Sequence, residues 1–325
     1  MYDVEKLVNG IFSGDKRAIA RSITLVESRL KEHREIAADL LERIVCNDKA
    51  CFRIGVTGVP GVGKSTFIEA LGNLVIQQGM KVAVLSIDPS SSLTGGSILG
   101  DKTRMELLSR RAEAYIRPSP SSGSLGGVAR RTRESALILE AAGFDVIFIE
   151  TVGVGQSETL VANMTDMFLL LLLPGGGDEL QGIKRGIMEL ADLVVINKAD
   201  GAQKDLAEKD VAEFTHAMRL MKARREQWKV PVVSCSALNA TSVDQVWDNI
   251  RQFFKALDAT GSLDSQRRQQ RQQWFIDEIN AGLLDVLEND PNLQQLLNHS
   301  RQLVDDGILV PTTAAAQLVK KILRF

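Results

Sequence analysis

The sequence predicts an α/β fold in which a doubly wound, mostly parallel sheet is flanked by helical segments at both ends of the chain. Between residues 53 and 257, short apolar runs alternate with amphipathic stretches, the pattern of strands joined by crossover helices. The two ends of the chain instead carry apolar residues at helical spacing. One run, Met167 to Leu173, is apolar throughout, as expected of a central strand that is covered on both faces.

The N-terminal region, residues 1–50, is predicted to be helical. Its apolar residues at three- and four-residue spacing include Ile36, Leu40, Leu41 and Ile44. The first residues are acidic where a secretory leader needs a basic region followed by an apolar run, so we expect no such leader.

Residues 51–258 are predicted to form the sheet domain. Its expected strands have the sequences RIGVT, VAVLSI, DVIFIE, FLLLLL, LVVIN and VPVVSCS. None of these runs approaches the roughly eighteen apolar residues that a membrane span needs. We therefore expect no membrane partner.

The C-terminal region, residues 259–325, is predicted to be helical after a turn-rich linker at Asp258 to Ser262. Arg267, Arg268 and Arg271 lie among glutamines without interleaved aromatic residues, so we interpret them as a solvated helix face and not as a nucleic-acid contact. An apolar stripe follows, made of Trp274, Phe275, Ile279, Leu283, Leu284 and Leu287. It needs a cover, either the core of its own chain or a second copy.

Charge and cysteine content narrow the function classes. A formal charge of -2 gives no global attraction to nucleic acid or to an anionic membrane. The three cysteines, Cys46, Cys51 and Cys235, are an odd number without CxxC spacing, and the three histidines lie far apart. We expect the reduced thiols of a cytoplasmic protein, without disulfides and without a zinc site.

The stretch GVPGVGKS matches the pattern GxxxxGK[ST] of a phosphate-binding loop between a strand and a helix. Glycines allow the backbone N–H groups to turn inward around a phosphate, and the following helix adds its own free amides. Lys64 is expected to reach the β- and γ-phosphates, and the Ser65 hydroxyl to bind Mg²⁺. The nucleotide-binding residues predicted here are Gly58, Val59, Pro60, Gly61, Val62, Gly63, Lys64, Ser65 and Thr66.

The stretch NKAD at the end of a predicted strand points to the base. A carboxylate at Asp200 can accept hydrogen bonds from N1–H and the 2-amino group of guanine, whereas adenine offers neither donor. Asn197 is expected to hold the other edge of the purine, and the stem of Lys198 to lie along the ring. A backbone amide of Ser236 or Ala237 is expected to meet the guanine O6. GTP and GDP are therefore the predicted ligands, although Asp200 alone also fits a helix N-cap.

Acidic residues at strand ends and on adjoining loops are candidate ligands of Mg²⁺, which prefers hard oxygen atoms. Asp88, Asp101 and Glu150 occupy such places, and Ser65 completes the predicted set. Each carboxylate taken alone also fits an ordinary cap or a surface charge. Gly153 follows Glu150 closely and offers a backbone amide to the γ-phosphate, so this segment is a natural nucleotide switch.

Other long motifs of the chain are SIDPSSSLTGGSILGDKTRM, PSPSSGSLGGVARRT, IETVGVGQSE and LLLPGGGDELQGIKRGI. Together with GVPGVGKST and NKAD they resemble the MeaB/MMAA-type GTPases, an ArgK-like group of P-loop GTPases of the SIMIBI class. Members of this group are chaperones of adenosylcobalamin-dependent methylmalonyl-CoA mutase. The resemblance covers essentially the whole chain, including both helical ends.

The resemblance implies slow GTP hydrolysis that the mutase stimulates, and a role in loading and protecting the mutase cofactor. It also implies a homodimer joined largely through the helical extensions. Ser65, Asp88, Asp101 and Glu150 would be magnesium and switch ligands, and Lys184 would belong to an additional switch loop in GGGDELQGIK.

The residue that orients the attacking water is not evident from the sequence. Phosphoryl transfer needs a positioned water and compensation of charge, part of which Lys64 and Mg²⁺ can supply. Gln156 is a candidate for the water, although it also fits a polar residue at a helix start. Arg104 and Lys184 are alternatives that a partner would bring into place.

Two other functions fit the same fold. A nickel or other metal-delivery GTPase is one, but the chain has no CxxC pair and no histidine-rich tract. An ATP-dependent kinase linked to basic amino-acid transport is the other. The NKAD stretch argues against ATP as its main nucleotide.

Overall fold

The computed structural model describes residues 2–45, 51–87, 105–118, 125–151, 157–175, 185–222 and 224–322. Contacts within the chain divide it into two units, Met1–Arg267 and Arg268–Phe325. The first unit contains the sheet and the second consists of helices.

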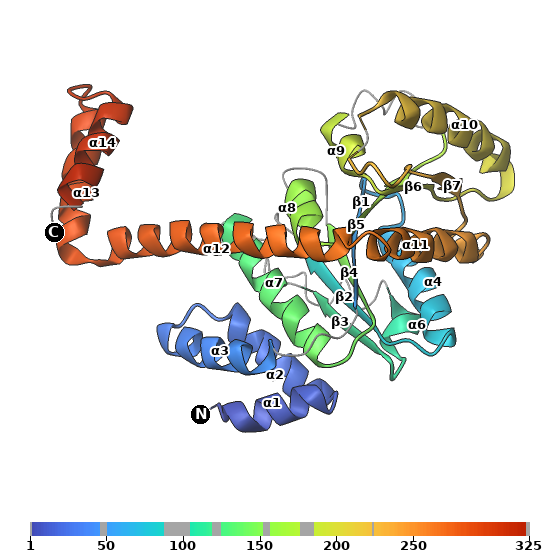
Figure 1. Cartoon of the computed structure of the whole chain (residues 1–325), viewed down its shortest axis with the longest axis horizontal. Coiled ribbons are helices and arrows are strands. Elements are labelled where there is room, and N and C mark those ends of the chain that lie inside the picture. The colour runs from blue at the N-terminus through green and yellow to red at the C-terminus, as the bar shows by residue number, and fades with distance from the viewer. Residues whose placement is uncertain are drawn as a thin grey trace. The chain divides into compact units, whose positions relative to one another are not determined.

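The described residues of the first unit form a seven-stranded sheet in which every strand pair is parallel (Figure 1). Its strands are β1 Phe52–Gly58, β2 Val82–Ile87, β3 Ala114–Pro118, β4 Val146–Thr151, β5 Met167–Leu172, β6 Leu193–Ile196 and β7 Val232–Ser234, and their order across the sheet is β3-β2-β4-β1-β5-β6-β7. Every residue of β5 is buried, and β5 lies between β1 and β6. The prediction of a parallel sheet with this central strand is confirmed.

Strand β3 was not predicted. It lies at the edge of the sheet beside β2, and its residues alternate between buried and half-buried. It contains Arg117, whose guanidinium pairs with Glu27, and it ends at Pro118, which has no N–H to donate. A short edge strand with these residues lacks the apolar run by which the other strands were identified.

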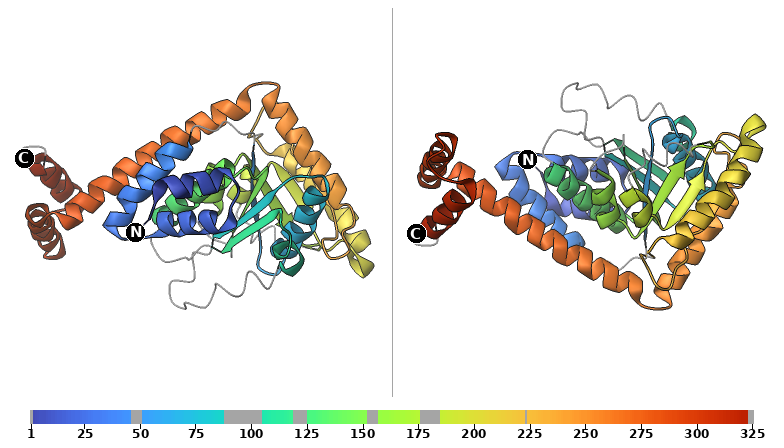
Figure 2. Two further views of the ribbon diagram at one scale, coloured as in Figure 1. Left: turned by 90° about the horizontal axis from the view of Figure 1, so that it is seen from below. Right: turned by 90° about the horizontal axis from the view of Figure 1, so that it is seen from above.

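Helices cover both faces of the sheet (Figure 2). Alternate strand residues supply the two sides, so that Val82 and Val84 of β2 belong to one core cluster and Ala83 and Leu85 to the other. One face is covered by α4 Lys64–Gln77, α6 Glu106–Ser109 and α11 Val243–Asp258. The opposite face is covered by α7 Leu125–Ala141, α8 Ser157–Met164, α9 Arg185–Leu190 and α10 Lys204–Leu220, the last preceded by the 3₁₀ turn Gly201–Gln203.

The N-terminal region forms three helices, α1 Val4–Phe12, α2 Lys16–Glu27 and α3 Lys31–Ile44. Asp3 caps α1 by accepting from the N–H of Lys6, and Asp15 caps α2 by accepting from the N–H of Arg17. Apolar residues of all three helices share a core cluster with α7 and α8. This region therefore extends the helical layer on one face of the sheet.

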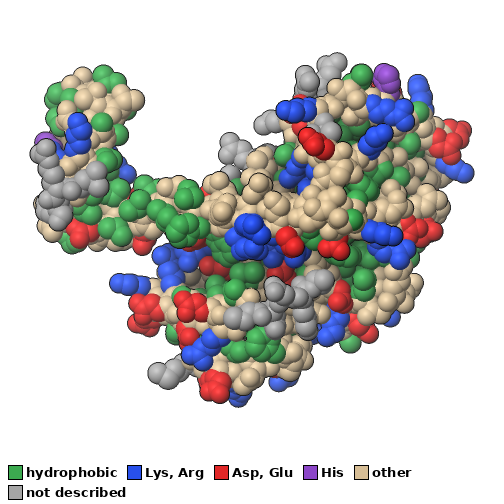
Figure 3. All heavy atoms as spheres, in the orientation of Figure 1, with side chains coloured by type: hydrophobic (Ala, Val, Ile, Leu, Met, Phe, Trp, Pro, Cys, Tyr) green, Lys and Arg blue, Asp and Glu red, His purple; other side chains and the backbone are tan. Residues whose placement is uncertain are grey.

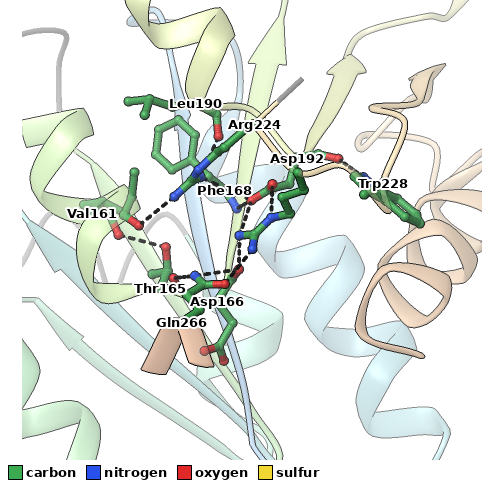
Figure 4. A network of polar contacts seen from close by, with 11 residues as sticks. Val161, Thr165, Asp166, Phe168, Leu190, Asp192, Arg224, Trp228 and Gln266 are labelled. Atoms are coloured by element: carbon green, nitrogen blue, oxygen red, sulfur yellow. Dashed lines mark hydrogen bonds and ion pairs between the residues drawn. The ribbon is translucent and has the colours of Figure 1, made fainter. Parts of the chain in front are cut away.

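Two buried aspartates lie at the amino edge of the sheet, each directly before a strand (Figure 4). Asp192, before β6, accepts from the N–H of Phe168 at 2.9 Å and from Nε of Arg225 at 2.8 Å. Its backbone oxygen accepts from the indole N–H of Trp228 at 2.7 Å. Arg224 donates to the backbone oxygen of Leu190, the last residue of α9, at 2.8 Å.

Asp166, before β5, accepts from the backbone N–H of Arg53 at 3.0 Å and from Nη2 of Arg267 at 2.7 Å. Gln266 donates to the backbone oxygens of Thr165 and Asp166. The interpretation of Arg267 as a solvated residue is therefore wrong, because its guanidinium neutralises a fully buried carboxylate. Arg268 and Arg271 are exposed, as predicted.

Helix α12, Ser262–Asn289, begins in the first unit and continues into the second. The second unit also contains α13 Pro291–Asp305 and α14 Pro311–Ile322, which pack against each other. Asp290 caps α13 by accepting from the N–H groups of Asn292 and Leu293, and Pro291 occupies the first turn. The described part of the chain has no helix long and apolar enough to cross a membrane.

Candidate nucleotide-binding site

The candidate site begins at the carboxyl edge of the sheet, where β1 ends at Gly58 and the chain turns into α4. Residues 59–63 form the connecting loop. Gly63 is the N-cap of α4 and no side chain caps the helix there, so the first amide groups of α4 lie at the loop. A phosphate held by the loop would accept hydrogen bonds from such amides and benefit from the helix dipole.

Glycine is required at the end of β1 and at the end of the loop. A Cβ atom on Gly58 would lie 2.5 Å from the backbone oxygen of Leu171, which leaves no room for any side chain. Gly63 has a φ of +90°, and a Cβ atom there would lie 3.0 Å from Nδ2 of Asn197. The loop is thus packed closely against the ends of β5 and β6.

Lys64 opens α4 and is only 8% exposed. Its Nζ donates to the backbone oxygen of Gly58 at 2.7 Å and to that of Val59 at 3.3 Å. These carbonyl groups hold the ammonium at the loop, where a phosphate would be bound. The same ammonium can exchange them for phosphate oxygens.

Two of the predicted magnesium ligands contact each other. The hydroxyl of Ser65, in the first turn of α4, donates to Oε1 of Glu150 in β4 at 3.0 Å. A hydroxyl and a carboxylate are hard oxygen donors of the kind that Mg²⁺ prefers. Among the described residues there is no group of three or more His, Cys, Asp or Glu that could hold a metal.

Asn197 connects three parts of the site. Its Nδ2 donates to the backbone oxygen of Val62 in the phosphate-binding loop at 2.8 Å, and its Oδ1 accepts from the backbone N–H of Ala237 at 3.1 Å. It is 1% exposed. Both ends of this amide are engaged with protein atoms, and so is the Ala237 amide that was considered for the guanine O6. Asn197 therefore holds the loop and the segment after β7 in register.

The two neighbouring motif residues also have defined positions. Lys198 has a φ of 60° and donates from Nζ to the backbone oxygen of Gly61 at 2.7 Å. The carboxylate of Asp200 accepts from the hydroxyl of Ser236, and that hydroxyl accepts from the N–H of Asn239 at 3.2 Å. Asp200 precedes the 3₁₀ turn but makes no side-chain cap hydrogen bond to it. Asp200 is therefore not the side-chain cap of this turn, and its contact with guanine stays a prediction.

The two described cysteines are free and buried. Burial raises the pKa of Cys235 to about 12, so its thiol stays protonated and donates to Oδ1 of Asn197 at 3.7 Å. Burial also raises the pKa of Cys51. The third cysteine, Cys46, lies outside the described residues.

Several predicted site residues lie outside the described part of the chain, so the structure places only the remainder. They are Asp88, Asp101, Arg104, Gly153, Gln156 and Lys184. The described residues bring together the phosphate-binding loop, Glu150, the NKAD segment and Ser236–Ala237. Thr66, in the first turn of α4, is exposed.

Sequence reasoning missed three buried hydroxyl groups beside the site. Thr57 and Thr151 are hydrogen-bonded to each other at 2.9 Å between β1 and β4. Ser86, near the end of β2, is buried and its Oγ has no hydrogen-bond partner in the described structure. The available signal was a polar residue close to the carboxyl end of a strand whose other residues are apolar.

A parallel sheet with a phosphate-binding loop after its first strand and an NKAD segment after its sixth defines a P-loop GTPase. Residues 19–292 match the family model described as methylmalonyl Co-A mutase-associated GTPase MeaB, and the chain belongs to this family.

Similar proteins extend the comparison. The chain is 45% identical over 305 residues to GTPase ArgK of Escherichia coli, covering 94% of this chain and 92% of that protein. It is 45% identical over 327 residues to the mitochondrial methylmalonic aciduria type A homolog of Mus musculus, and the match covers 98% of this chain and 79% of that protein. A crystal structure described as a LAO/AO transport system kinase is 36% identical, with a TM-score of 0.78 and coverage of 99% of both chains.

Proposed function

We propose that this protein is a chaperone that binds and hydrolyses GTP and assists the loading and protection of a B12-dependent methylmalonyl-CoA mutase. The observation that carries the nucleotide part is the link from the phosphate-binding loop through Asn197 to the segment that holds Asp200. The mutase part is supported by the description of the family and by the name of the mouse relative.

The phosphate end of the proposed site uses charge and backbone amides. Lys64 exchanges its loop carbonyl contacts for the β- and γ-phosphates, and the first amides of α4 donate to the same oxygens. Ser65 and Glu150, with Asp88 and Asp101, would hold Mg²⁺, which when bound neutralises phosphate charge. Further residues proposed at the nucleotide are Gly58, Val59, Pro60, Gly61, Val62, Gly63, Thr66 and Gly153.

The base end gives the preference for guanine. The Ser236 hydroxyl donates to one oxygen of Asp200 and thereby orients the carboxylate. A guanine base offers two N–H donors to such a carboxylate, whereas an adenine base would leave it without partners. Lys198, anchored on Gly61, would cover the ring. Asn197 and Ala237 keep this end in register with the loop.

GTP hydrolysis by the protein alone would be slow if the group that orients the attacking water is in place only in the complex with the mutase. We propose Gln156, Arg104 and Lys184 as candidates for that role, with the mutase as the partner that stimulates hydrolysis. Electrostatic stabilisation by Lys64 alone would leave the attacking water without a defined position. We further place the protein in the cytoplasm, which suits the free thiols of Cys51 and Cys235.

We assign three roles along the chain, with residues 1–50 as a supporting helical region, 51–258 as the GTPase domain and 259–325 as the dimerisation region. Helix α12 carries a row of exposed apolar side chains, visible in Figure 3, that includes Phe275, Ile276, Ile279, Leu283 and Leu284. Contiguous apolar surface of this kind favours association with a second copy.

The test is GTP hydrolysis by the purified protein, alone and with methylmalonyl-CoA mutase, beside an ATP control. We expect slow GTP turnover that rises with the mutase, and little use of ATP. If the mutase neither changed the turnover nor bound the protein, the proposed partnership would be wrong and the proposed GTPase activity would stand.

Asp200→Asn should weaken GDP binding about a hundredfold, because an amide cannot accept both guanine donors as the carboxylate does. The matched control is Asp205→Asn, an exposed carboxylate in the first turn of α10 that should bind GDP like the unmodified protein. Fluorescent GDP titrations measure both variants. Equal GDP affinities of the two variants would show that Asp200 does not bind the base.

A kinase remains the second candidate, because the structurally similar protein carries that description. It predicts efficient ATP use and phosphate transfer to a protein or small-molecule acceptor. The Asp200 carboxylate disfavours ATP in this chain. The sequence argues against a metal-delivery GTPase, because it has no CxxC pair and no histidine-rich tract.

A further inference from the structure

Ser86 is a buried hydroxyl beside the candidate magnesium site that has no hydrogen-bond partner in the described structure. It lies in β2 and is 1% exposed. Buried polar groups in folded proteins are nearly always hydrogen-bonded, so an exception calls for a physical reason.

The sheet register shows which group can serve Ser86. On one side it is aligned with Glu150 of β4, and on the other with Pro118 of β3. Neighbouring strands lie about 4.8 Å apart, and aligned residues of parallel strands point to the same face. Proline has neither an N–H nor a polar side chain, so the β3 side offers no side-chain partner. The Glu150 carboxylate is the acceptor that the register brings beside Ser86.

The alternation of core residues supports the same face for both side chains. Val84 of β2 and Phe148 of β4 belong to the core cluster that faces α4, and Ser86 and Glu150 follow them by two residues. Val84 and Phe148 are both fully buried. Ser86 is thus aligned with a buried carboxylate that already accepts from Ser65.

We propose that Ser86 is a positioning residue, whose hydroxyl donates to the Glu150 carboxylate when the magnesium–nucleotide complex is bound. This inference rests on the proposed function. A hydroxyl that ligates a metal keeps its proton, so Ser65 can continue to donate to one oxygen of Glu150. Rotation of the Ser86 side chain between its staggered positions supplies a second donor. Two donors from different elements would fix a carboxylate that has one more methylene group than aspartate.

The test compares Ser86→Ala with Ser135→Ala. Ser135 lies in α7, in the layer on the opposite face of the sheet, and is likewise a buried serine without a hydrogen-bond partner in the described structure. Both substitutions remove an unpaired hydroxyl and neither should lower the thermal midpoint. Ser86→Thr, which retains the hydroxyl, is the rescue variant.

The readout is the Mg²⁺ concentration at which release of fluorescent GDP is slowed to half its magnesium-free rate, with GTP turnover as a second measurement. We expect Ser86→Ala to need about tenfold more Mg²⁺, since hydrogen bonds to charged groups are the strong ones. Ser135→Ala and Ser86→Thr should match the unmodified protein. GDP affinity in EDTA should be the same in all variants.

Equal magnesium dependence in Ser86→Ala and Ser135→Ala would overturn the positioning role. A fall of GDP affinity in EDTA for Ser86→Ala would also overturn it, since the defect would then not involve the ion. Failure of the proposed function has a different signature, because the unmodified protein itself would bind no GDP or show no magnesium dependence.

Discussion

Thr57 and Thr151 connect the strand before the phosphate-binding loop to the strand that carries Glu150. Their hydroxyls lie 2.9 Å apart and both side chains are buried. The register aligns Val56 with Glu150, so the two threonines are adjacent on the face opposite the Glu150 side chain. The pair therefore links the ends of β1 and β4 that lead into the candidate site.

Replacing one of these threonines with valine preserves its shape but leaves the other hydroxyl without its partner. We expect Thr57→Val or Thr151→Val to lower the free energy of unfolding by about 1–3 kcal/mol, as for an unsatisfied buried polar group. The double variant should lose less than the sum of the two, because no unpaired hydroxyl remains. Urea unfolding without nucleotide measures this, and simple additivity would show that the hydroxyls do not interact.

At the scale of elements, the amino edge of the sheet holds the start of α12 through two residues of its second turn. Arg267 and Gln266 contact Asp166 and Thr165, which connect α8 to β5. Burial of the Arg267 guanidinium opposes its charge, but the hydrogen bond and the negative charge of Asp166 raise its pKa. The buried ion pair of Arg267 and Asp166 thus anchors the start of the helix to the sheet.

Arg267→Met should destabilise the first unit by about 3 kcal/mol, because it leaves the buried Asp166 carboxylate without its counter-charge. Arg251→Met is the matched control, since Arg251 pairs with Asp248 on the surface and its side chain is 55% exposed. Loss of that pair should change stability by less than about 1 kcal/mol. Urea unfolding of both variants gives the comparison, and equal losses would contradict the anchoring role of Arg267.

The sequence predicted the elements whose structure is determined by neighbouring residues, and it did not predict features that depend on tertiary packing. The apolar run of β5 and the glycines before α4 are local patterns, and both were predicted. Strand β3 was missed because its edge position, which no local pattern encodes, tolerates half-exposed residues. Asn197 was identified from its motif, but its bond to Val62, 135 residues away, depends on tertiary packing.

At the scale of the whole molecule, the long helix α12 differs from the sheet and its covering helices in what it buries. The first unit encloses three apolar core clusters, whereas α12 has no buried residue in the structure. Its exposed side chains at positions 275, 279 and 283 recur every four residues and therefore lie along one face of the helix. Pairing this face with the same face of a second copy would remove its apolar side chains from water, which is favourable.

The proposed homodimer gives the last prediction. Leu283 is 59% exposed and belongs to this apolar face. In a symmetric dimer each substitution occurs twice, so Leu283→Asp removes two leucines from the interface and introduces two charges. With about 1.5–3 kcal/mol for each buried leucine, the dissociation constant should rise at least about a hundredfold. Light scattering at micromolar concentration should then give the mass of one chain.

Leu220→Asp is the control, because Leu220 is 75% exposed at the end of α10 in the first unit and lies outside the proposed interface. It should leave the mass at that of two chains. Fluorescent GDP binding should be unchanged in both variants, because neither residue belongs to the nucleotide site. If Leu283→Asp retained the mass of two chains, the dimer would have to form through another surface. If the unmodified protein had the mass of one chain, the apolar face would serve a different partner.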